Sequence, residues 1–165
     1  MNYLAYAGIG SRETPSVTLQ EMKVIASRLE TWHWTLRSGG AEGADSAFAS
    51  GTTSKEIYLP WAGFNNQYSK YQSPSKAAHK MASEFHPAWE RCSQGARKLH
   101  ARNCYQILGP ELDSPVKCVI CWTADGKTSG GTGQAMRIAE HYGIPIMNLY
   151  NMNAYEVLHR ISKGI

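Results

Sequence analysis

The sequence lacks any apolar run of the roughly 18 residues that a helix needs to cross a bilayer. The N-terminus has neither the charged start nor the apolar core of a signal peptide. Internal repeats of fixed period and low-complexity segments are also missing. We therefore expect a soluble, cytoplasmic protein with no membrane partner. A length of 165 residues with 42% hydrophobic content predicts one domain over 1–165.

Cysteine is scarce, with only four residues, and their context does not favour a metal site. Cys118 and Cys121 lie in a strand-like run, where residues three apart point to opposite faces and are poorly placed to ligate one ion. We expect reduced, buried thiols, no metal and no cofactor.

Two common catalytic signatures are missing. No lysine-serine pair of the P-loop type follows any glycine-rich turn, which disfavours a kinase or a magnesium-dependent NTPase. No Gly-x-Ser-x-Gly nucleophile elbow is present either. If the chain binds phosphate, it must do so through backbone amides and arginine.

The elements that are present alternate between strands and helices. We expect strands at 3–7, 32–37, 56–60, 116–122 and 144–149. Helices are expected after Thr14, with Pro15 as the first helical residue, and then at 43–49, 90–108, 134–142 and 153–162. Pro145 favours an edge position for the last strand. This order predicts an α/β, Rossmann-like fold, with a mostly parallel sheet of about five strands and helices on both faces.

Three glycine-rich turns follow expected strands and precede helical patterns. Such turns place bare backbone amides at a helix N-terminus, where anions are favoured. In a parallel sheet these turns open at one edge, so we predict that all three converge on one anionic ligand. The phosphate-binding candidates from the turns are Gly8, Gly10, Ser11, Arg12, Ser38, Gly39, Gly40, Ala41, Asp45, Gly130, Gly131, Thr132, Gly133 and Gln134.

Two of these candidates have a second interpretation. Arg12 either contacts phosphate or forms a salt bridge with Glu13 or another acid. Asp45 either accepts a hydrogen bond from a ribose hydroxyl or caps its own helix turn.

An aromatic and basic insertion spans about 60–90. Its polar residues alternate with aromatic ones, which is typical of a binding loop or lid, although a packed surface loop would have the same composition. Trp61 and Tyr68 are the candidates for stacking on a base. Between Pro60 and Gly109 there are seven basic and two acidic residues, a net charge of +5, which fits either an anionic ligand or a solvated helix face.

The three turns, taken in this order, resemble the SMF/DprA–LOG (SLOG) superfamily of Rossmann-like nucleotide-binding domains. Ser38 to Asp45 is similar to the Ser-Gly-Gly-Ala-x-Gly-Ile-Asp stretch of DprA, with Ala44 in place of isoleucine. Gly130 to Gly133 resembles the Pro-Gly-Gly-x-Gly-Thr-x-x-Glu motif of the LOG enzymes, which release a base from nucleoside monophosphates. Leu99 to Asn103 resembles their Met-His-x-Arg-Lys motif, which adds Arg102 and Asn103 to the binding candidates.

The LOG resemblance departs at its catalytic position. Arg137 stands where that family has its glutamate, and Gln134 replaces the threonine. N-glycosidic cleavage needs a carboxylate, so we assign no catalytic residue and place Arg137 among the residues that provide positive charge for the ligand. A rearranged acid, Glu42, Asp45 or Glu140, is the alternative.

Three hypotheses follow. The first is a protein that binds a small anionic nucleotide, such as an ADP-ribose-type or cyclic nucleotide signal, without turnover. It would sequester the signal, a role that suits a phage or bacterial antagonist of nucleotide signalling. The second is a LOG-type nucleotide glycosidase or phosphohydrolase. The third is a DprA-like protein that binds single-stranded DNA. Members of this superfamily often form dimers, so the resemblance implies a homo-oligomer. The contact candidates are Tyr105, Leu108, Tyr155, Leu158 and Ile161, although both sets also fit ordinary core packing.

Overall fold

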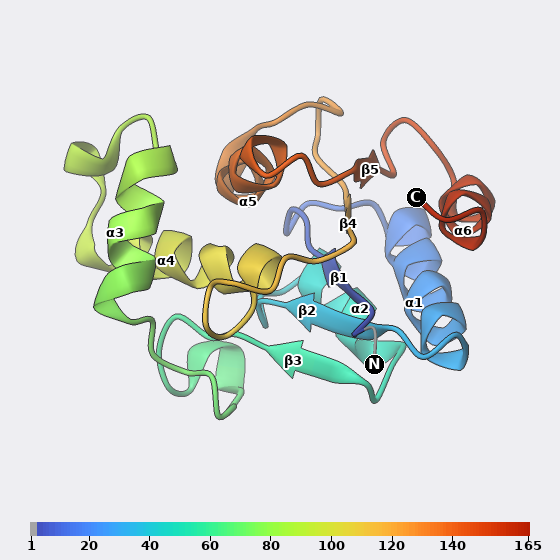
Figure 1. Ribbon diagram of the computed structural model, residues 1–165, viewed down its shortest axis with the longest axis horizontal. Helices are drawn as coiled ribbons and strands as arrows, with labels where there is room; N and C mark the ends of the chain where they lie inside the picture. Colours follow the sequence, from blue (N-terminus) through green and yellow to red (C-terminus); the bar gives the residue numbers. More distant parts are fainter. Residues whose placement is uncertain (1–2) are drawn as a thin grey trace.

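In the computed structural model, which describes residues 3–165, five parallel strands form one sheet in the order β3-β2-β1-β4-β5 (Figure 1). The strands are β1 (Ala5–Gly8), β2 (Thr35–Ser38), β3 (Lys55–Ile57), β4 (Cys118–Cys121) and β5 (Ile146–Asn148). β5 lies at the sheet edge, as Pro145 predicts. The α/β, Rossmann-like fold class is confirmed.

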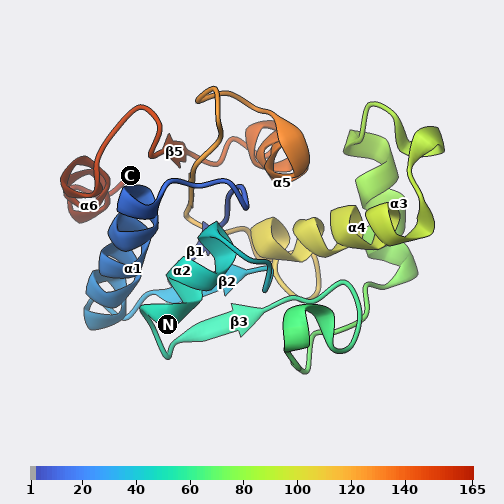
Figure 2. The same ribbon diagram turned by 180° about the vertical axis from the view of Figure 1, so that it is seen from behind.

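Helices cover both faces of the sheet, and each face has its own core. Residues of α1 (Ser16–Thr31), α2 (Ala44–Ser50) and α6 (Ala154–Ser162) pack on one face, together with Cys118 and Ile120. Residues of α3 (Lys76–Phe85), α4 (Gln94–Leu108) and α5 (Gly130–His141) pack on the other, together with Val119 and Cys121. Figure 2 shows α1 and α2 in front of the sheet. Alternate residues of β4 thus face opposite cores, and Cys118 and Cys121 are separated by the sheet, as expected.

The strand order reverses beside β1, which determines where a ligand site can form. The chain moves outward from β1 through β2 to β3, then crosses back and places β4 on the other side of β1. The loops that leave the carboxyl ends of β1 and β4 therefore lead to opposite faces of the sheet and leave a crevice between them. Ligands of open α/β sheets bind at such a point.

Several predicted boundaries are wrong for local reasons. Pro15 is the N-cap of α1 and not its first helical residue, and the Thr14 hydroxyl donates to the Ser11 carbonyl at 2.6 Å. The expected helix at 90–108 is divided into the short 3₁₀ helix η2 (Trp89–Arg91) and α4, because the Ser93 side chain caps α4 through the amide of Ala96. α5 begins at Gly130, so the third glycine turn is the first turn of this helix.

The insertion at 60–90 is more regular than a loop. It contains the 3₁₀ helix η1 (Phe64–Asn66) and the ten-residue helix α3, which is capped by Ser75 and packs on α4. Tyr58, the residue after β3, stacks between Tyr71 and Tyr105 at centroid distances of 4.6 and 5.4 Å. The insertion therefore builds the outer layer of one face of the domain.

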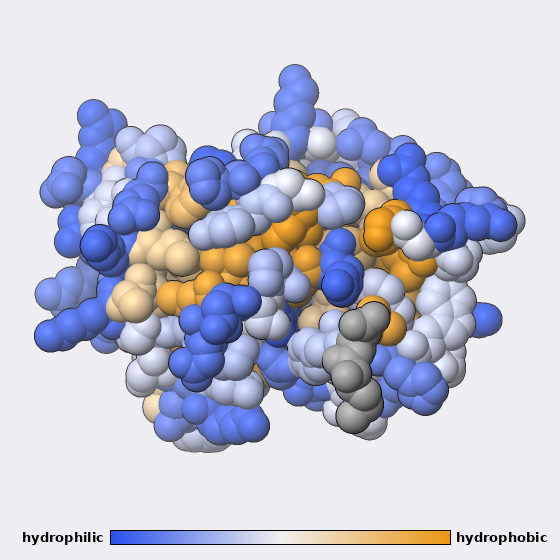
Figure 3. Space-filling model, in the orientation of Figure 1, coloured by the Kyte–Doolittle hydropathy of each residue, from blue (hydrophilic) through white to orange (hydrophobic). Residues whose placement is uncertain are grey.

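The surface helps to evaluate the predicted oligomer contacts. Hydrophobic residues form a band across the middle of the face in Figure 3, bordered by hydrophilic ones. Leu108 and Ile161 are buried in the two cores and are not available to a partner, whereas Tyr155 is 75% exposed.

Within residues 3–165, no helix is both long and apolar enough to span a membrane.

Candidate nucleotide-binding site

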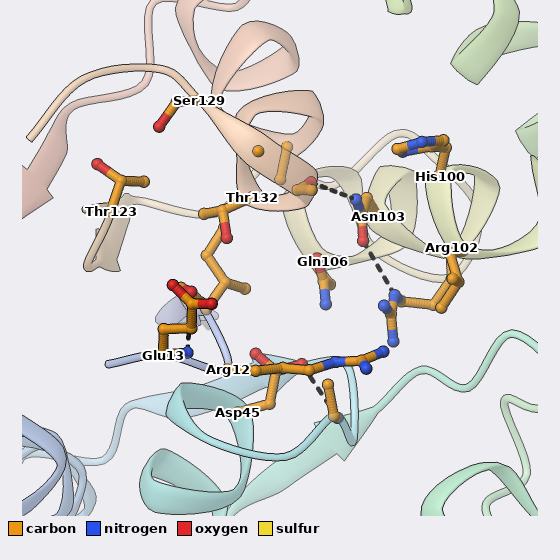
Figure 4. Close-up of a pocket in the computed structure, with 18 of the residues that line it drawn as sticks. Arg12, Glu13, Asp45, His100, Arg102, Asn103, Gln106, Thr123, Ser129 and Thr132 are labelled. Atoms are coloured by element: carbon orange, nitrogen blue, oxygen red, sulfur yellow. Dashed lines mark hydrogen bonds between the residues drawn. The ribbon is translucent and has the colours of Figure 1, made fainter. Parts of the chain in front are cut away.

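A cavity of about 580 Å³ opens at the reversal of strand order, among the carboxyl ends of β1 and β4 and one side of α4 (Figure 4). Its volume lies within the range of ligand pockets of roughly 300–1,000 Å³. The residues that line it come from segments far apart in the sequence: Ile9, Gly10, Ser11, Arg12, Glu13, Ala41, Asp45, Phe64, Ala96, Leu99, His100, Arg102, Asn103, Gln106, Thr123, Ala124, Ser129, Gly130, Gly131, Thr132 and Ala135.

The N-terminus of α5 forms one wall of this cavity. The first helical hydrogen bond of α5 is donated by the Gly133 amide to the carbonyl of the N-cap residue Ser129, at 2.9 Å. The amides of Gly130, Gly131 and Thr132 belong to the first turn, where no helical carbonyl is available to accept from them. Gly130 has a φ of +64°, which favours glycine. This wall therefore presents backbone donors and the positive end of a helix dipole.

Two guanidinium groups approach the cavity from opposite sides. Arg102, on α4, is 6% exposed and donates to the carbonyls of Gly39 and Tyr58 and to Oδ1 of Asn103. Arg12 is exposed in the loop after β1, and Figure 4 shows its side chain extending toward Arg102. In the part of the chain that the structure describes, neither arginine forms an ion pair. Their mutual repulsion favours an anion between them.

Asp45 lies at the floor of this arrangement, on the first turn of α2. Its Oδ2 accepts from the Ala41 amide at 3.2 Å, in the loop before α2. The N-cap of α2 is Gly43, so Asp45 does not cap its own helix turn as the second interpretation expected. Burial raises the pKa of Asp45 to about 6, and the nearby Arg102 opposes this increase. Asp45 therefore partly offsets the positive charge of the cavity at neutral pH and less so in weak acid.

Apolar and amide side chains complete the cavity. The Phe64 ring, from η1, lies under the Arg102 guanidinium, with 5.7 Å from Cζ to the ring centroid. Asn103 joins two walls, because its Oδ1 accepts from Arg102 and its Nδ2 donates to the Gly131 carbonyl at 3.3 Å. The cavity thus places an aromatic ring directly beside one of its two guanidinium groups.

Comparison with known proteins gives a similarity to a solved structure. No protein-family model and no curated protein matches the chain. Among solved structures, it is similar to DNA processing protein A from Helicobacter pylori, a protein whose single-stranded DNA binding mode that structure describes. The two sequences are 16% identical, the match covers 97% of this chain and 80% of the other, and the TM-score is 0.47. The similarity is one of fold alone.

Ten of the predicted binding residues line the cavity. They come from all three glycine turns and from α4: Gly10, Ser11, Arg12, Ala41, Asp45, Arg102, Asn103, Gly130, Gly131 and Thr132. Three of the backbone amides expected to bind phosphate are already bonded within the protein, one of them the Gly133 amide described above. The Ser11 amide donates to the Trp122 carbonyl at 3.3 Å, and the Ala41 amide donates to Asp45.

The centre of the second turn does not reach the cavity, contrary to the prediction. Ser38, Gly39 and Gly40 are buried. The Ser38 hydroxyl donates to the Gly8 carbonyl at 2.6 Å, and the Gly40 carbonyl accepts from the amides of Asn65 and Gln67. These residues hold the turn under the insertion. Gly8 also has a packing role, because a Cβ there would lie 2.6 Å from Leu36 and 2.7 Å from Phe48.

Three predicted residues of α5 face the protein interior or α3. Gly133 is buried, and the Gln134 side chain donates to the Ala82 carbonyl at 3.0 Å. Arg137 donates to the Phe85 carbonyl at 3.1 Å and to Oε1 of Gln134 at 2.8 Å. The side chains of Gln134 and Arg137 thus point toward α3 and hydrogen-bond to its carbonyls. The predicted contacts of these two residues with a ligand are replaced by bonds between α3 and α5.

The stacking candidates lie outside the cavity. Tyr68 is 81% exposed, and Trp61 is 38% exposed with its ring edge-on to Phe64 at 5.2 Å. Phe64 itself is the aromatic residue that lines the cavity. The alternation of aromatic and polar residues in the insertion does not distinguish Phe64 from its neighbours.

His100 is a further cavity residue that was not among the predicted site residues. It lies on α4, next to the predicted Arg102 and Asn103. Burial lowers the pKa of His100 to about 4, and the positive charges of His86, Arg137 and Arg102 act in the same direction. The cavity therefore contains a neutral imidazole at physiological pH. Its position within the Leu99 to Asn103 segment was the signal that could have identified it.

Proposed function

We propose that this cavity binds the phosphate groups of a nucleotide or nucleotide-derived signal. The observation that carries the proposal is that Arg12, Arg102 and the first turn of α5 face one cavity. Guanidinium groups and helix N-terminal amides are the groups that bind phosphate when no metal is involved. An anionic ligand would relieve the repulsion between the two guanidinium groups, because it supplies the negative charge that they lack.

The ligand would extend from Arg12 and the first turn of α5 toward Phe64, whose ring lies beside the Arg102 guanidinium. The Phe64 ring and the aliphatic residues Ala96 and Leu99 form an apolar wall on the α4 side of the cavity. Stacking of a base on an aromatic ring contributes about 1–3 kcal/mol. We therefore place the phosphates near Arg12 and Gly131 and the base near Phe64.

Binding without turnover is the simplest outcome for this set of residues. Of the three carboxylates considered as a rearranged acid, Glu42 and Glu140 do not line the cavity, and Glu140 instead accepts from the Thr128 hydroxyl at 2.7 Å. A protein that holds its ligand intact would act by sequestration, with tight one-to-one binding and slow release.

Hydrolysis of the ligand is a second candidate, which Asp45 favours. This residue lines the cavity, and its pKa of about 6 keeps part of the carboxyl population protonated near neutral pH. A carboxyl with such a pKa can serve as a general acid toward the leaving base of an N-glycosidic bond.

Titration calorimetry with AMP, cyclic AMP, ADP-ribose and oligo-dT, followed by chromatography of the recovered ligand, tests these functions. Recovery of an intact nucleotide after submicromolar binding supports sequestration. Release of free base or cleaved phosphate supports hydrolysis. Affinity for oligo-dT alone would favour a single-stranded DNA-binding protein, and millimolar affinity for every nucleotide would exclude sequestration.

A further inference from the structure

Three side chains with metal-ligating atoms meet beside the cavity, on the α3 side of α4. His86 is the C-cap of α3, Cys92 follows η2, and His100 lies on α4. One ligand atom from each lies within 4.8 Å of the other two. The Cys92 Sγ is 3.8 Å from Nδ1 and 3.9 Å from Nε2 of His86, and the two imidazole rings have a centroid distance of 4.3 Å.

Two arginines hold the segment that carries His86 and Cys92. Arg97, one turn before His100 on α4, donates to the Trp89 carbonyl from Nε at 3.3 Å and from Nη2 at 3.1 Å. Its guanidinium also lies over the Trp89 ring, 5.1 Å from the centroid. From the other side, Arg137 donates to the carbonyl of Phe85, the residue before His86. These bonds fix the backbone on either side of His86 and before Cys92. The positions of the two side chains therefore do not depend only on their contacts with each other and with His100.

The ligand atoms of this cluster have weak or missing partners. Nδ1 of His100 is buried and has no hydrogen-bond partner among residues 3–165, which is uncommon for a buried polar atom. The Cys92 thiol makes only a 3.6 Å contact with the Ala88 carbonyl besides its contacts with His86. His86 Nδ1 accepts from the Ala88 amide at 3.0 Å. An ion here would exchange the two Ala88 contacts for ligand bonds and give the His100 nitrogen a partner.

We propose that His86, Cys92 and His100 form a three-ligand site for Zn²⁺. Tetrahedral zinc with bonds of about 2.0–2.3 Å requires ligand atoms roughly 3.3–3.7 Å apart, so ligand atoms that now lie within 4.8 Å of one another need to close by up to about 1.5 Å. One thiolate and two imidazoles select zinc over magnesium or calcium. The guanidinium groups of Arg102 and Arg137 oppose a cation near His100, and the negative charge of the Cys92 thiolate offsets them. Water would occupy the fourth position.

The spacing of these ligands explains why the sequence did not reveal them. Five residues separate His86 from Cys92, and seven separate Cys92 from His100. This is not a Cys-x-x-Cys or His-x-x-x-His pattern, and the prediction of no metal considered only the cysteines. The site arises because α3 turns back onto α4.

Zinc titration of the metal-stripped 165-residue chain against a chromophoric chelator, without any nucleotide, tests the proposal. We expect one Zn²⁺ per chain in the wild-type protein and in His159→Gln, an exposed histidine on α6. We expect loss of this binding in Cys92→Ser and in His100→Gln. Absence of one-to-one binding in the wild type, or binding that persists in Cys92→Ser, would overturn it.

Cobalt substitution of the wild-type protein provides a measurement that does not depend on the folding of a variant. Co²⁺ in this site should show thiolate-to-metal charge transfer and the intense visible bands of tetrahedral coordination, and Zn²⁺ should abolish both. A spectrum without a thiolate contribution would contradict the assignment of Cys92. Because the titration contains no nucleotide, its failure would leave the proposed nucleotide site untouched, and the reverse also holds.

Discussion

The second and third glycine-rich turns have similar sequences but opposite surroundings. In the second turn, Gly39 and Gly40 are buried and their carbonyls accept from Arg102, Asn65 and Gln67. In the third, Gly130 and Gly131 are exposed at the start of α5 and line the cavity. A glycine-rich turn after a strand therefore identifies a place where the backbone is closely approached by other atoms. The rest of the fold determines whether those atoms belong to buried side chains, as in the second turn, or whether the turn faces a cavity, as in the third.

The largest expected effect is a difference in stability between two glycine-to-alanine variants, one in each turn. A Cβ on Gly39 would meet Gln106 and the Arg102 guanidinium, with 2.7 Å to Cζ, so Gly39→Ala should lower the free energy of unfolding by about 3 kcal/mol. A Cβ on Gly131 would have nothing within 4 Å, so Gly131→Ala should change stability by less than about 1 kcal/mol. Urea denaturation without ligand measures both. Equal losses would contradict the distinction between the turns.

The next effect separates ligand binding from folding. Arg12→Ala should weaken nucleotide affinity by about tenfold to hundredfold, because a charge-assisted contact with phosphate is lost, and should leave stability unchanged because the side chain is exposed. Calorimetry with the best nucleotide of the panel measures the affinity. Arg160→Ala, an exposed arginine on α6, is the matched control and should bind like the wild type. An equal loss in both variants would indicate a general charge effect.

A smaller effect concerns pH. The pKa of Asp45 is raised to about 6 from 3.8, so the folded protein holds this proton more tightly than the unfolded chain. Its contribution to stability therefore decreases as pH rises from about 4 to about 6. Affinity for ADP-ribose, whose phosphates do not titrate in this range, should fall by about threefold to tenfold between pH 5 and pH 7.

Asp45→Asn separates this carboxyl from other causes of pH dependence. Asparagine retains an oxygen that can accept from the Ala41 amide but carries no charge. Its affinity for ADP-ribose should therefore stay nearly constant between pH 5 and pH 7. Calorimetry at several pH values measures the two profiles, and a wild-type slope that persists in Asp45→Asn would assign the titration to another group.

The smallest effect tests how the second turn is held. Gln67→Ala removes one of the two side-chain amides that donate to the Gly40 carbonyl and should cost about 1 kcal/mol of stability, since Asn65 still bonds there. Nucleotide affinity should not change, because neither Gln67 nor Gly40 lines the cavity. Thermal unfolding and calorimetry measure the two quantities. A clear loss of affinity would place the second turn in the ligand site after all.

The fold was largely predictable because its signals are local. Runs of strand length end at Gly8, Ser38 and Cys121, and each is followed by a turn and a helical pattern. Arg102 and Asn103 were also found, through their resemblance to a motif. The insertion was harder to interpret, because the aromatic residues that pack on α4 and the one that lines the cavity, Phe64, alternate with polar residues in the same way.

By itself, the sequence determined the class of fold and the strands after which glycine-rich turns stand, because strand and turn preferences act over a few neighbouring residues. Only the tertiary structure decided which turns face the cavity. That outcome depends on bonds across long separations, such as Arg102 with Gly39 and Gln134 with Ala82. The same holds for His86, Cys92 and His100, which become neighbours only when α3 packs on α4.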